Sequence, residues 1–164
     1  MTLVSARDSI PIFVMSYNDL PSLRLCLRSL TRRTCRKHTI TVVDNASSHE
    51  ELRRYLDKLA TLTAIQVVRQ RRNLWVLGLN GPVRAWARQS ADDAMFVVTD
   101  CDIVVPPIRD GACWLTRLER MMRTHACVGK LGLSLDLGYI QSRPSYAHTY
   151  ERERFFMQGP RIGD

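Results

Sequence analysis

Two aspartates, Asp100 and Asp102, stand one residue apart in "MFVVTDCDIVVPP" (residues 95–107), behind a run of apolar residues. In an extended segment residues i and i+2 point the same way, so both carboxylates share one side while Cys101 turns to the other. Carboxylates held that close repel each other and raise one pKa unless a cation lies near them. Mg²⁺ or Mn²⁺ accepts one or two carboxylates and completes its shell with water and phosphate oxygens. The spacing therefore predicts a divalent metal site that would hold a diphosphate.

A structural interpretation competes with the metal site. Asp100 would then cap a turn and Asp102 would be solvated, and a pair of aspartates at this spacing is common in proteins. The position of the pair at the end of a predicted buried strand favours the metal.

Short apolar runs alternate with amphipathic segments along the chain. Strands are predicted at Ile10–Ser16, His38–Asp44, Ile65–Arg69, Ala94–Val98 and Cys127–Leu137. Apolar residues at helical spacing predict four helices between or after them, around residues 23–30, 52–59, 83–87 and 115–122. Strands that alternate with helices predict an α/β fold, a mostly parallel, Rossmann-like sheet with helices on both faces. From Gly138 onward the periodicity fades, and we expect one short helix between loops.

Polar residues follow each of the first four predicted strands. In open parallel sheets, ligands bind beyond the carboxyl ends of the strands, because side chains and loops converge there. The polar residues at these ends are Ser16, Tyr17, Asn18, Asp44, Asn45, Arg69, Arg71, Arg72, Asn73, Asp100 and Asp102. This gathering carries more weight than any single motif.

The chain has 164 residues, with 24 lysines and arginines against 16 acids and a formal charge of +8. The length suits one domain with a real core, and the charge favours an anionic partner such as a nucleotide, a phosphorylated lipid or an acidic membrane face. Five cysteines form no CxxC pair and predict reduced thiols. No leader or spanning segment is recognisable. We expect a cytoplasmic protein, with peripheral contact at the inner face of the membrane left open, and no nucleic-acid partner.

The order of "IPIFVMSYND", "ITVVDNASS", "VVRQRRNLWVLGLNGPVRAWA" and "MFVVTDCDIVVPP" resembles the nucleotide-sugar binding half of family 2 glycosyltransferases. The resemblance covers roughly Ile10 to Leu135. It implies the GT-A fold and a transferase that moves a sugar from a nucleotide-diphosphate donor to an acceptor hydroxyl, usually with inversion. It also implies Mg²⁺ or Mn²⁺ at the two aspartates and a saccharide or lipid-linked acceptor, as in surface polysaccharide or glycolipid synthesis.

The resemblance also implies roles for single residues. Asp44 would accept from the N–H of uracil, which favours a UDP-sugar, and Asn45 would border the same pocket. Asp100 would reach the ribose or metal-bound water, and Asp102 the metal itself. The other implied donor-side residues are Ser16, Tyr17, Asn18, Asn73, Asn80 and Arg84.

Several of these residues have structural alternatives. For Asp44, the competing structural interpretation is a helix cap that works with Ser47. Asn80 precedes Gly81-Pro82 and would fit a turn that opens a helix. The arginines at 69, 71 and 72 either offer guanidinium groups to phosphate or are solvated.

The sequence departs from the family pattern in two places. Trp75 stands where the family usually has a glycine, two positions after the loop asparagine. The predicted donor domain is residues 1–137, and only residues 138–164 follow it. In the family, a longer acceptor-binding segment follows the donor domain and supplies the catalytic base. The base candidates are Asp136, which is the best positioned, Glu151 and Glu153. The two glutamates also suit i,i+4 helix pairs with arginines.

Two other functions compete with a complete transferase. A truncated or non-catalytic nucleotide-sugar binding module, or a subunit of a larger transferase, would need no base. A nucleotidyltransferase shares the sheet and the metal logic, but such enzymes usually begin with a glycine-rich phosphate loop, and "SYNDLPS" (residues 16–22) contains no glycine.

Overall fold

The computed structural model describes residues 9–105, 107, 111 and 113–157. The chain divides into two compact units, Met1–Thr124 and His125–Asp164. Within the described residues, the first unit contains the sheet and the second contains helices but no strand.

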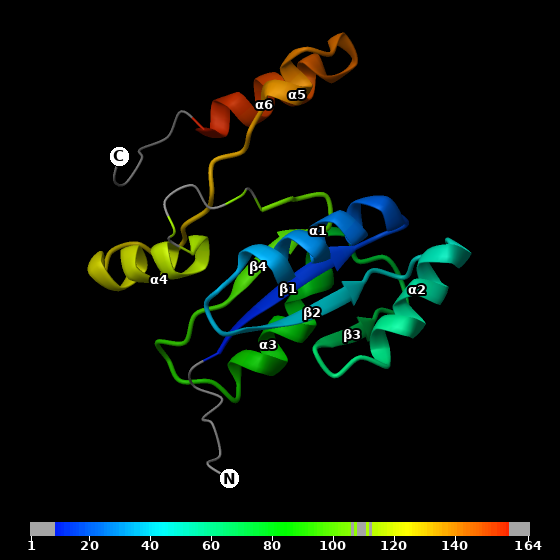
Figure 1. Ribbon diagram of the computed structural model, residues 1–164, viewed down its shortest axis with the longest axis horizontal. Helices are drawn as coiled ribbons and strands as arrows, with labels where there is room; N and C mark the ends of the chain where they lie inside the picture. Colours follow the sequence, from blue (N-terminus) through cyan, green and yellow to red (C-terminus); the bar gives the residue numbers. More distant parts are fainter. Residues whose placement is uncertain (1–8, 106, 108–110, 112, 158–164) are drawn as a thin grey trace. The chain divides into compact units, whose positions relative to one another are not determined.

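Four parallel strands form one sheet in the order β3-β2-β1-β4 (Figure 1). The strands are β1 (Ile10–Ser16), β2 (His38–Asp44), β3 (Ile65–Arg69) and β4 (Val97–Asp100). The α/β prediction and the bounds of the first three strands are confirmed. The predicted bounds of the fourth strand, Ala94–Val98, are wrong. Its ladder begins where Val97 pairs with Ile12 and continues until Asp100 pairs with Met15, so the first aspartate of the pair belongs to the sheet itself.

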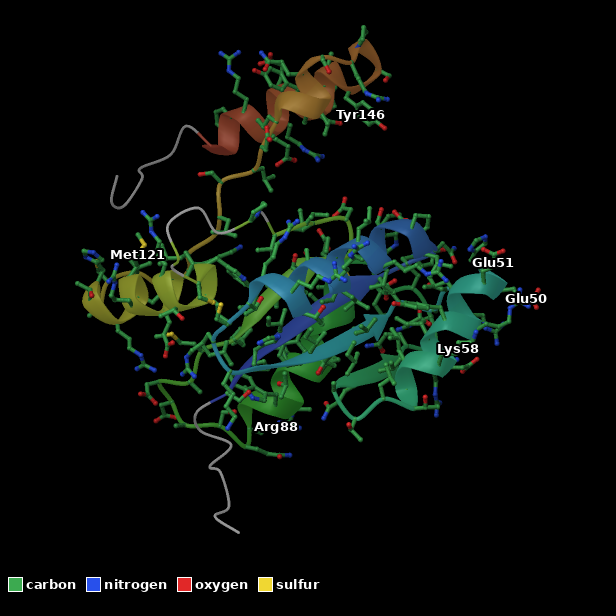
Figure 2. All side chains as sticks on the ribbon, in the orientation of Figure 1. Glu50, Glu51, Lys58, Arg88, Met121 and Tyr146 are labelled. Atoms are coloured by element: carbon green, nitrogen blue, oxygen red, sulfur yellow. The ribbon has the colours of Figure 1, made fainter. Side chains whose placement is uncertain are left out.

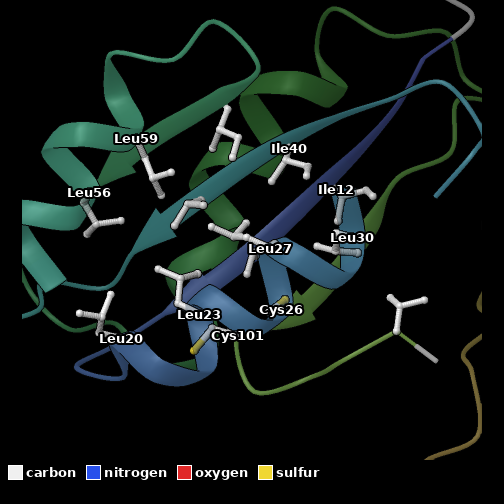
Figure 3. Close-up of a cluster of buried hydrophobic side chains, with 14 of the residues drawn as sticks. Ile12, Leu20, Leu23, Cys26, Leu27, Leu30, Ile40, Leu56, Leu59 and Cys101 are labelled. Carbon is white, nitrogen blue, oxygen red and sulfur yellow. The ribbon is translucent and has the colours of Figure 1, made fainter. Parts of the chain in front are cut away.

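Helices α1 (Leu20–Arg33) and α2 (Glu50–Ala60) pack on one face of the sheet (Figure 3). Alternate strand residues point to this face, as expected for a pleated strand. The buried cluster contains Ile10, Ile12, Val14, Ile40 and Val42 from the sheet and Leu23, Leu27, Leu30, Leu52, Leu56 and Leu59 from the helices. The predicted spacing of apolar residues in both helices is therefore confirmed.

Local signals fix where these helices begin. The carboxylate of Asp19 accepts a hydrogen bond from the backbone N–H of Ser22 at 3.0 Å, which caps α1. In α2, Glu50 and Glu51 occupy the first turn and Lys58 the last (Figure 2). This distribution complements the helix dipole, because the N-terminus of a helix favours negative charge and its C-terminus favours positive charge.

The opposite face of the sheet is covered by α3 (Asn80–Ala87), which lies behind the sheet in Figure 1. Phe13 points to this face because it alternates with Ile12 and Val14. Its ring meets Trp86 edge-on at 6.3 Å between centroids, and Trp86 meets Phe96 in the same way at 5.4 Å. Helices on both faces of the sheet are thus confirmed, and Trp86 serves packing.

Helix α4 (Trp114–Thr124) is tied to the segment between α1 and β2. The indole N–H of Trp114 donates to the hydroxyl of Thr34 at 3.0 Å, and the guanidinium of Arg36 donates to the carboxylate of Glu119 at 2.7 Å. The Arg36 hydrogen bond is the main reason that the pKa of Glu119 lies below its ordinary value, and Arg123 adds to it.

Replacing Glu119 with glutamine is expected to lower the free energy of unfolding at neutral pH by about 1–2 kcal/mol, since a charge-assisted hydrogen bond is lost. A carboxyl whose folded pKa is lowered stabilises the fold above its unfolded pKa, and this contribution disappears as the pH falls through the folded pKa. The difference between Glu119→Gln and wild type should therefore shrink in acid. Urea unfolding across pH measures it, with Asp93→Asn, at an exposed site outside any helix, as the control. A constant difference at every pH would contradict the prediction.

The five cysteines are free thiols, as expected. Cys26, Cys101 and Cys113 are buried. Burial raises the pKa of Cys26 to about 12 and also raises the pKa of Cys101. Burial acts in the same direction on Cys113, but the backbone N–H groups around its sulfur outweigh it and bring its pKa to about 7. Among those groups, the N–H of Cys35 lies 3.1 Å from the Cys113 sulfur.

The second unit contains α5 (Gly138–Gln141), the 3₁₀ helix η3 (Pro144–Tyr146) and α6 (Ala147–Met157). The predicted strand Cys127–Leu137 is wrong, because this segment joins no β-ladder in the described residues. Apolar and polar residues do alternate along it, but a strand also needs a neighbour to accept its backbone hydrogen bonds. Among the helices that the structure describes, none combines the length and the hydropathy of a transmembrane span.

Candidate functional site

The parallel sheet brings its polar strand ends to one edge, which we call the carboxyl edge. Ser16, the last residue of β1, pairs with Asp44, the last residue of β2. In the register of the strands, Asp44 lies beside Arg69 at the end of β3, and Asp100 lies beside Met15 of β1. Four strand ends therefore meet there, as the sequence predicts.

Asp100 and Asp102 are exposed at the end of β4, while Cys101 between them is only 8% exposed. This alternation is the one expected from the spacing. Among the described residues, neither carboxylate has a hydrogen bond or an ion pair. The pKa of Asp100 is raised, first by partial removal of its carboxyl from water and second by the negative charge of Asp102. The pair thus concentrates negative charge that no neighbouring cation neutralises within the described part of the chain.

The chemistry of this pair fits a hard divalent cation. In the described ranges, no three His, Cys, Asp or Glu side chains lie close enough to hold a metal by protein ligands alone. Mg²⁺ in particular is commonly held by one or two carboxylates, with water and phosphate oxygens as the remaining ligands. Asp100 and Asp102 are suited to such a shared site, in which the ligand of the protein would supply part of the coordination.

Asp44 is buried at the end of β2 and makes a turn contact. One of its carboxylate oxygens accepts the backbone N–H of Ser47 at 3.1 Å. The contact with Ser47 is the one that the structural alternative predicted, although Asp44 does not cap α2, which begins at Glu50 after His49. The hydrogen bond fixes the orientation of the Asp44 carboxylate toward the loop that follows.

Ser16 is fully buried, and its hydroxyl interacts with the thiol of Cys101, an interaction that acts to lower the pKa of Cys101. Tyr17, the next residue, is 47% exposed at the same edge. Of these two predicted donor-side neighbours, the side chain of Tyr17 is thus the accessible one.

Asn18 joins the loop after β1 to the start of α2. It adopts a left-handed backbone conformation with φ of 52°. Its side-chain oxygen accepts the backbone N–H groups of Ser48 at 2.9 Å and His49 at 3.0 Å. Its own backbone N–H donates to the hydroxyl of Ser47 at 3.0 Å. Asn18 therefore orders the edge through hydrogen bonds that already occupy its side-chain oxygen.

Asn45 is 2% exposed, and its amide organises the loop after β3. The nitrogen of this amide donates to the side-chain oxygen of Asn73 at 2.8 Å and to the carbonyl of Trp75 at 3.1 Å. Its oxygen accepts the backbone N–H of Leu74 at 2.9 Å. Asn45 thus holds the loop, and Asn73 is oriented by it.

Two further residues of this loop were not singled out from the sequence. The amide nitrogen of Gln70 donates to the carbonyl of Gly78 at 2.9 Å. A Cβ atom on Gly78 would come within 2.9 Å of the side-chain oxygen of Asn45, so only glycine fits against that amide. The sequence signal for Gly78 was a glycine inside an apolar run, which typically marks a close backbone approach.

Replacing Gly78 with alanine is expected to destabilise the protein by about 1–3 kcal/mol, because Asn45 is buried and its hydrogen bonds prevent it from moving aside. Gly81→Ala is the matched control. Apart from its neighbours in the chain, no atom lies within 4 Å of a Cβ there, so the added methyl group meets no buried side chain. Thermal unfolding of both variants compares them, and a Gly78→Ala protein as stable as wild type would contradict the prediction.

The profile of Glycosyl transferase family 2 matches residues 12–127, which is more than half of the chain. The chain belongs to glycosyl transferase family 2. The matched region contains β2, β3, β4, β1 from Ile12 onward, and the carboxyl edge described above.

Among solved structures, a crystal structure of S. aureus TarS, residues 1–349, is similar to this family 2 chain. The identity is 16% and the TM-score 0.49, with 77% of this chain and 39% of that chain covered. The match therefore spans about 39% of the length of the TarS chain. No curated protein sequence matches the chain.

Trp75, at the position where the resemblance predicts a glycine, has an unusual backbone conformation. The residue has a φ of 51°, a left-handed conformation that glycine adopts without strain and that a bulky residue rarely adopts. The position thus keeps the backbone conformation suited to glycine while carrying an indole.

The remaining predicted donor-side residues lie on α3 and after β3. Asn80 and Arg84 are exposed one turn apart on α3, so they share one side of the helix. The guanidinium of Arg69 instead contacts α2, where it pairs with Asp57 at 2.8 Å. Arg71 and Arg72 are exposed. Of the three arginines considered for phosphate, Arg69 is thus engaged in an ion pair.

The base candidates belong to the second unit. Asp136 is exposed, and one of its carboxylate oxygens accepts the backbone N–H two residues later at 2.9 Å. Glu151 pairs with Arg154 at 3.7 Å and Glu153 with Arg152 at 3.0 Å. The two glutamates therefore make ion pairs with arginines, although at spacings of three residues and one residue instead of the predicted i,i+4 spacing.

Proposed function

We propose that the chain binds a nucleotide-diphosphate sugar at the carboxyl edge and takes part in transfer of the sugar to an acceptor hydroxyl. Membership of family 2 supports sugar transfer, and the exposed, unneutralised carboxylates of Asp100 and Asp102 support a metal-held diphosphate. This pair is the observation that carries the proposal. We favour UDP as the nucleotide, because the Asp44 carboxylate would accept the N–H of uracil.

Each part of the edge has a proposed role. Asp102 would bind Mg²⁺ or Mn²⁺, and Asp100 would bind the same ion or the ribose. When bound, the ion would polarise the diphosphate and stabilise the negative charge that develops as it leaves. The residues proposed to line the nucleotide and the sugar are Ser16, Tyr17, Asn18, Asp44, Asn45, Asn73 and Asn80, with Arg84 beside them. Asn18 and Asn45 would act by ordering the loops, because their side chains are hydrogen-bonded within them.

The transfer itself would proceed with inversion. The acceptor oxygen would bond to the anomeric carbon while the bond from that carbon to the diphosphate oxygen breaks. A carboxylate would take the proton of the acceptor hydroxyl. Asp136 is the proposed base, because its carboxylate is exposed, whereas Glu151 and Glu153 are held by arginines.

A nucleotide-sugar binding module, or a subunit of a larger transferase, is the second candidate. The division of the chain into two compact units favours it, because the donor-side residues belong to Met1–Thr124 and every base candidate belongs to the other unit. Such a module would bind donor but would not transfer sugar alone. For the first candidate, the complete transferase, we propose a saccharide or lipid-linked acceptor. We also propose a cytoplasmic location with peripheral contact at the membrane.

Calorimetric titration of the chain with UDP and with GDP, each with and without Mn²⁺, tests the proposal. We expect Mn²⁺-dependent binding of UDP that is tighter than binding of GDP. The absence of Mn²⁺-dependent binding of either nucleotide would overturn it. Sugar transfer by the isolated chain would exclude the binding module.

A further inference from the structure

Three consecutive apolar side chains project from the carboxyl edge at the start of η2 (Trp75–Leu79). Trp75 and Val76 are each 77% exposed and Leu77 is 59% exposed. We call these three residues the 75–77 patch. A single exposed apolar side chain is ordinary, but a contiguous exposed group marks an interaction surface.

The patch is held firmly in place. The Asn45 amide binds the backbone of Leu74 and Trp75, and the Gln70 amide binds the carbonyl of Gly78. These contacts fix the chain on both sides of the exposed side chains. The left-handed backbone of Trp75 is costly for a bulky residue, and such strain is commonly retained where function requires it. The fold therefore presents an indole to the outside at the cost of local strain.

Positive charge accompanies the patch. Arg71 and Arg72 are exposed a few residues before it, and neither has a hydrogen bond or an ion pair with any described residue. Acidic residues are also present at this edge. Asp100 and Asp102 follow β4, which is separated from β3 by β2 and β1 in the sheet. Glu50 and Glu51 lie at the start of α2 (Figure 2), and the carboxylate of Glu50 is 3.9 Å from the guanidinium of Arg54. The unpaired arginines thus give the segment around the patch a local positive charge.

We propose that residues 71–77 dock the chain on an anionic lipid bilayer. Tryptophan and leucine side chains enter the boundary between headgroups and acyl chains, and nearby arginines bind headgroup phosphates. The contact is peripheral and involves no spanning helix of the described residues. Charge complementarity decides for lipid, because the apolar side chains stand beside two cations that lack described partners.

The proposal goes beyond sugar transfer and does not rest on it. Docking through the 75–77 patch would bring the carboxyl edge to the membrane surface, where the hydroxyl of a lipid-linked acceptor would be within reach. Binding to lipid is measured without nucleotide or metal, so its failure is distinguishable from failure of the proposed transfer.

The test is flotation of the full chain with phosphatidylcholine vesicles, alone or mixed with phosphatidylglycerol. We expect binding to the mixed vesicles only, weakened by salt. The double variant Trp75→Ser/Leu77→Ser should bind at least about tenfold more weakly, since apolar surface no longer leaves water. Arg71→Ser/Arg72→Ser should bind about 30-fold more weakly. Each basic residue near an anionic surface raises the affinity about five- to sixfold, and the two factors multiply.

Matched controls separate docking from general changes in charge or stability. Arg28→Ser/Arg32→Ser removes the same charge from exposed positions of α1 and should lose less affinity than the pair near the patch. Leu62→Ser removes an apolar side chain that is 53% exposed at the opposite edge, before β3, and should bind as wild type does. Trp75→Phe keeps an apolar ring and should retain most of the binding to vesicles. This variant keeps the test valid if the serine variant does not fold.

Three outcomes would overturn the proposal. The first is no binding to anionic vesicles by wild type. The second is equal loss of binding in the Arg28/Arg32 and Arg71/Arg72 variants, which would indicate general electrostatic attraction. The third is self-association in sedimentation that Trp75→Ser abolishes while lipid binding persists, which would assign the patch to a second copy of the chain.

Discussion

Replacing Asp102 with alanine is expected to abolish the Mn²⁺ dependence of UDP binding and to lower sugar transfer by at least about 10³-fold. The carboxylate is exposed at the end of β4, and no described residue neutralises it. Its proposed role is to hold a cation that stabilises the leaving diphosphate, and such stabilisation is worth several kcal/mol. Calorimetry with UDP, with and without Mn²⁺, measures the binding part directly.

Asp92→Ala is the matched control for this experiment. Asp92 is also an exposed aspartate, but it precedes β4 and so lies toward the opposite edge of the sheet. It should bind UDP and Mn²⁺ as wild type does. Full Mn²⁺-dependent binding by Asp102→Ala would remove the metal from the proposal.

The raised pKa of Asp100 adds a pH dependence to the same site. A cation must compete with the proton on this carboxyl, so its affinity should fall as the pH decreases through the raised pKa. In the absence of metal, a carboxyl with a raised folded pKa favours the folded state at low pH, and this contribution is lost as the pH rises through that pKa. Asp100→Asn should remove both effects, which Mn²⁺ titrations and unfolding measurements at several pH values would detect.

Replacing Asn45 with aspartate is expected to destabilise the protein by about 3–5 kcal/mol at neutral pH. The amide nitrogen of Asn45 donates to two oxygens, one on Asn73 and one on Trp75. A carboxylate at that position would face both oxygens as a buried, unpaired charge, which is a costly arrangement. The loop that presents Asn73 and the 75–77 patch would lose its support.

This prediction has a characteristic pH dependence. The new carboxyl should have a raised pKa in the folded state, so the variant should be least destabilised in acid and lose stability as the pH rises. Urea unfolding at several pH values measures the change. Asn80→Asp is the control, since Asn80 is exposed at the start of α3, where a negative charge is favourable. Equal stability of both variants would show that Asn45 does not hold the loop.

The sequence alone determined the fold class and most of the elements. β1, β2 and β3 have the predicted bounds, because short apolar runs between turn-forming residues are a local signal that needs no knowledge of distant neighbours. The alternation of strands and helices then dictates a parallel sheet, whose carboxyl ends gather the polar residues. The spacing of Asp100 and Asp102 likewise fixed that both carboxylates would be outside while Cys101 is buried.

The tertiary structure decided which polar residues of the edge are available to a ligand. Asn18 and Asn45 make hydrogen bonds with residues about 30 positions away in the sequence, and Ser16 is buried beneath the edge. No local pattern reports such contacts, because the crossovers between parallel strands bring these residues together only when the sheet forms. The prediction of a strand at Cys127–Leu137 was wrong for the same reason. Alternation is a property of the segment, whereas a β-strand exists only beside a hydrogen-bonded neighbour, and only the folded chain determines where that neighbour is.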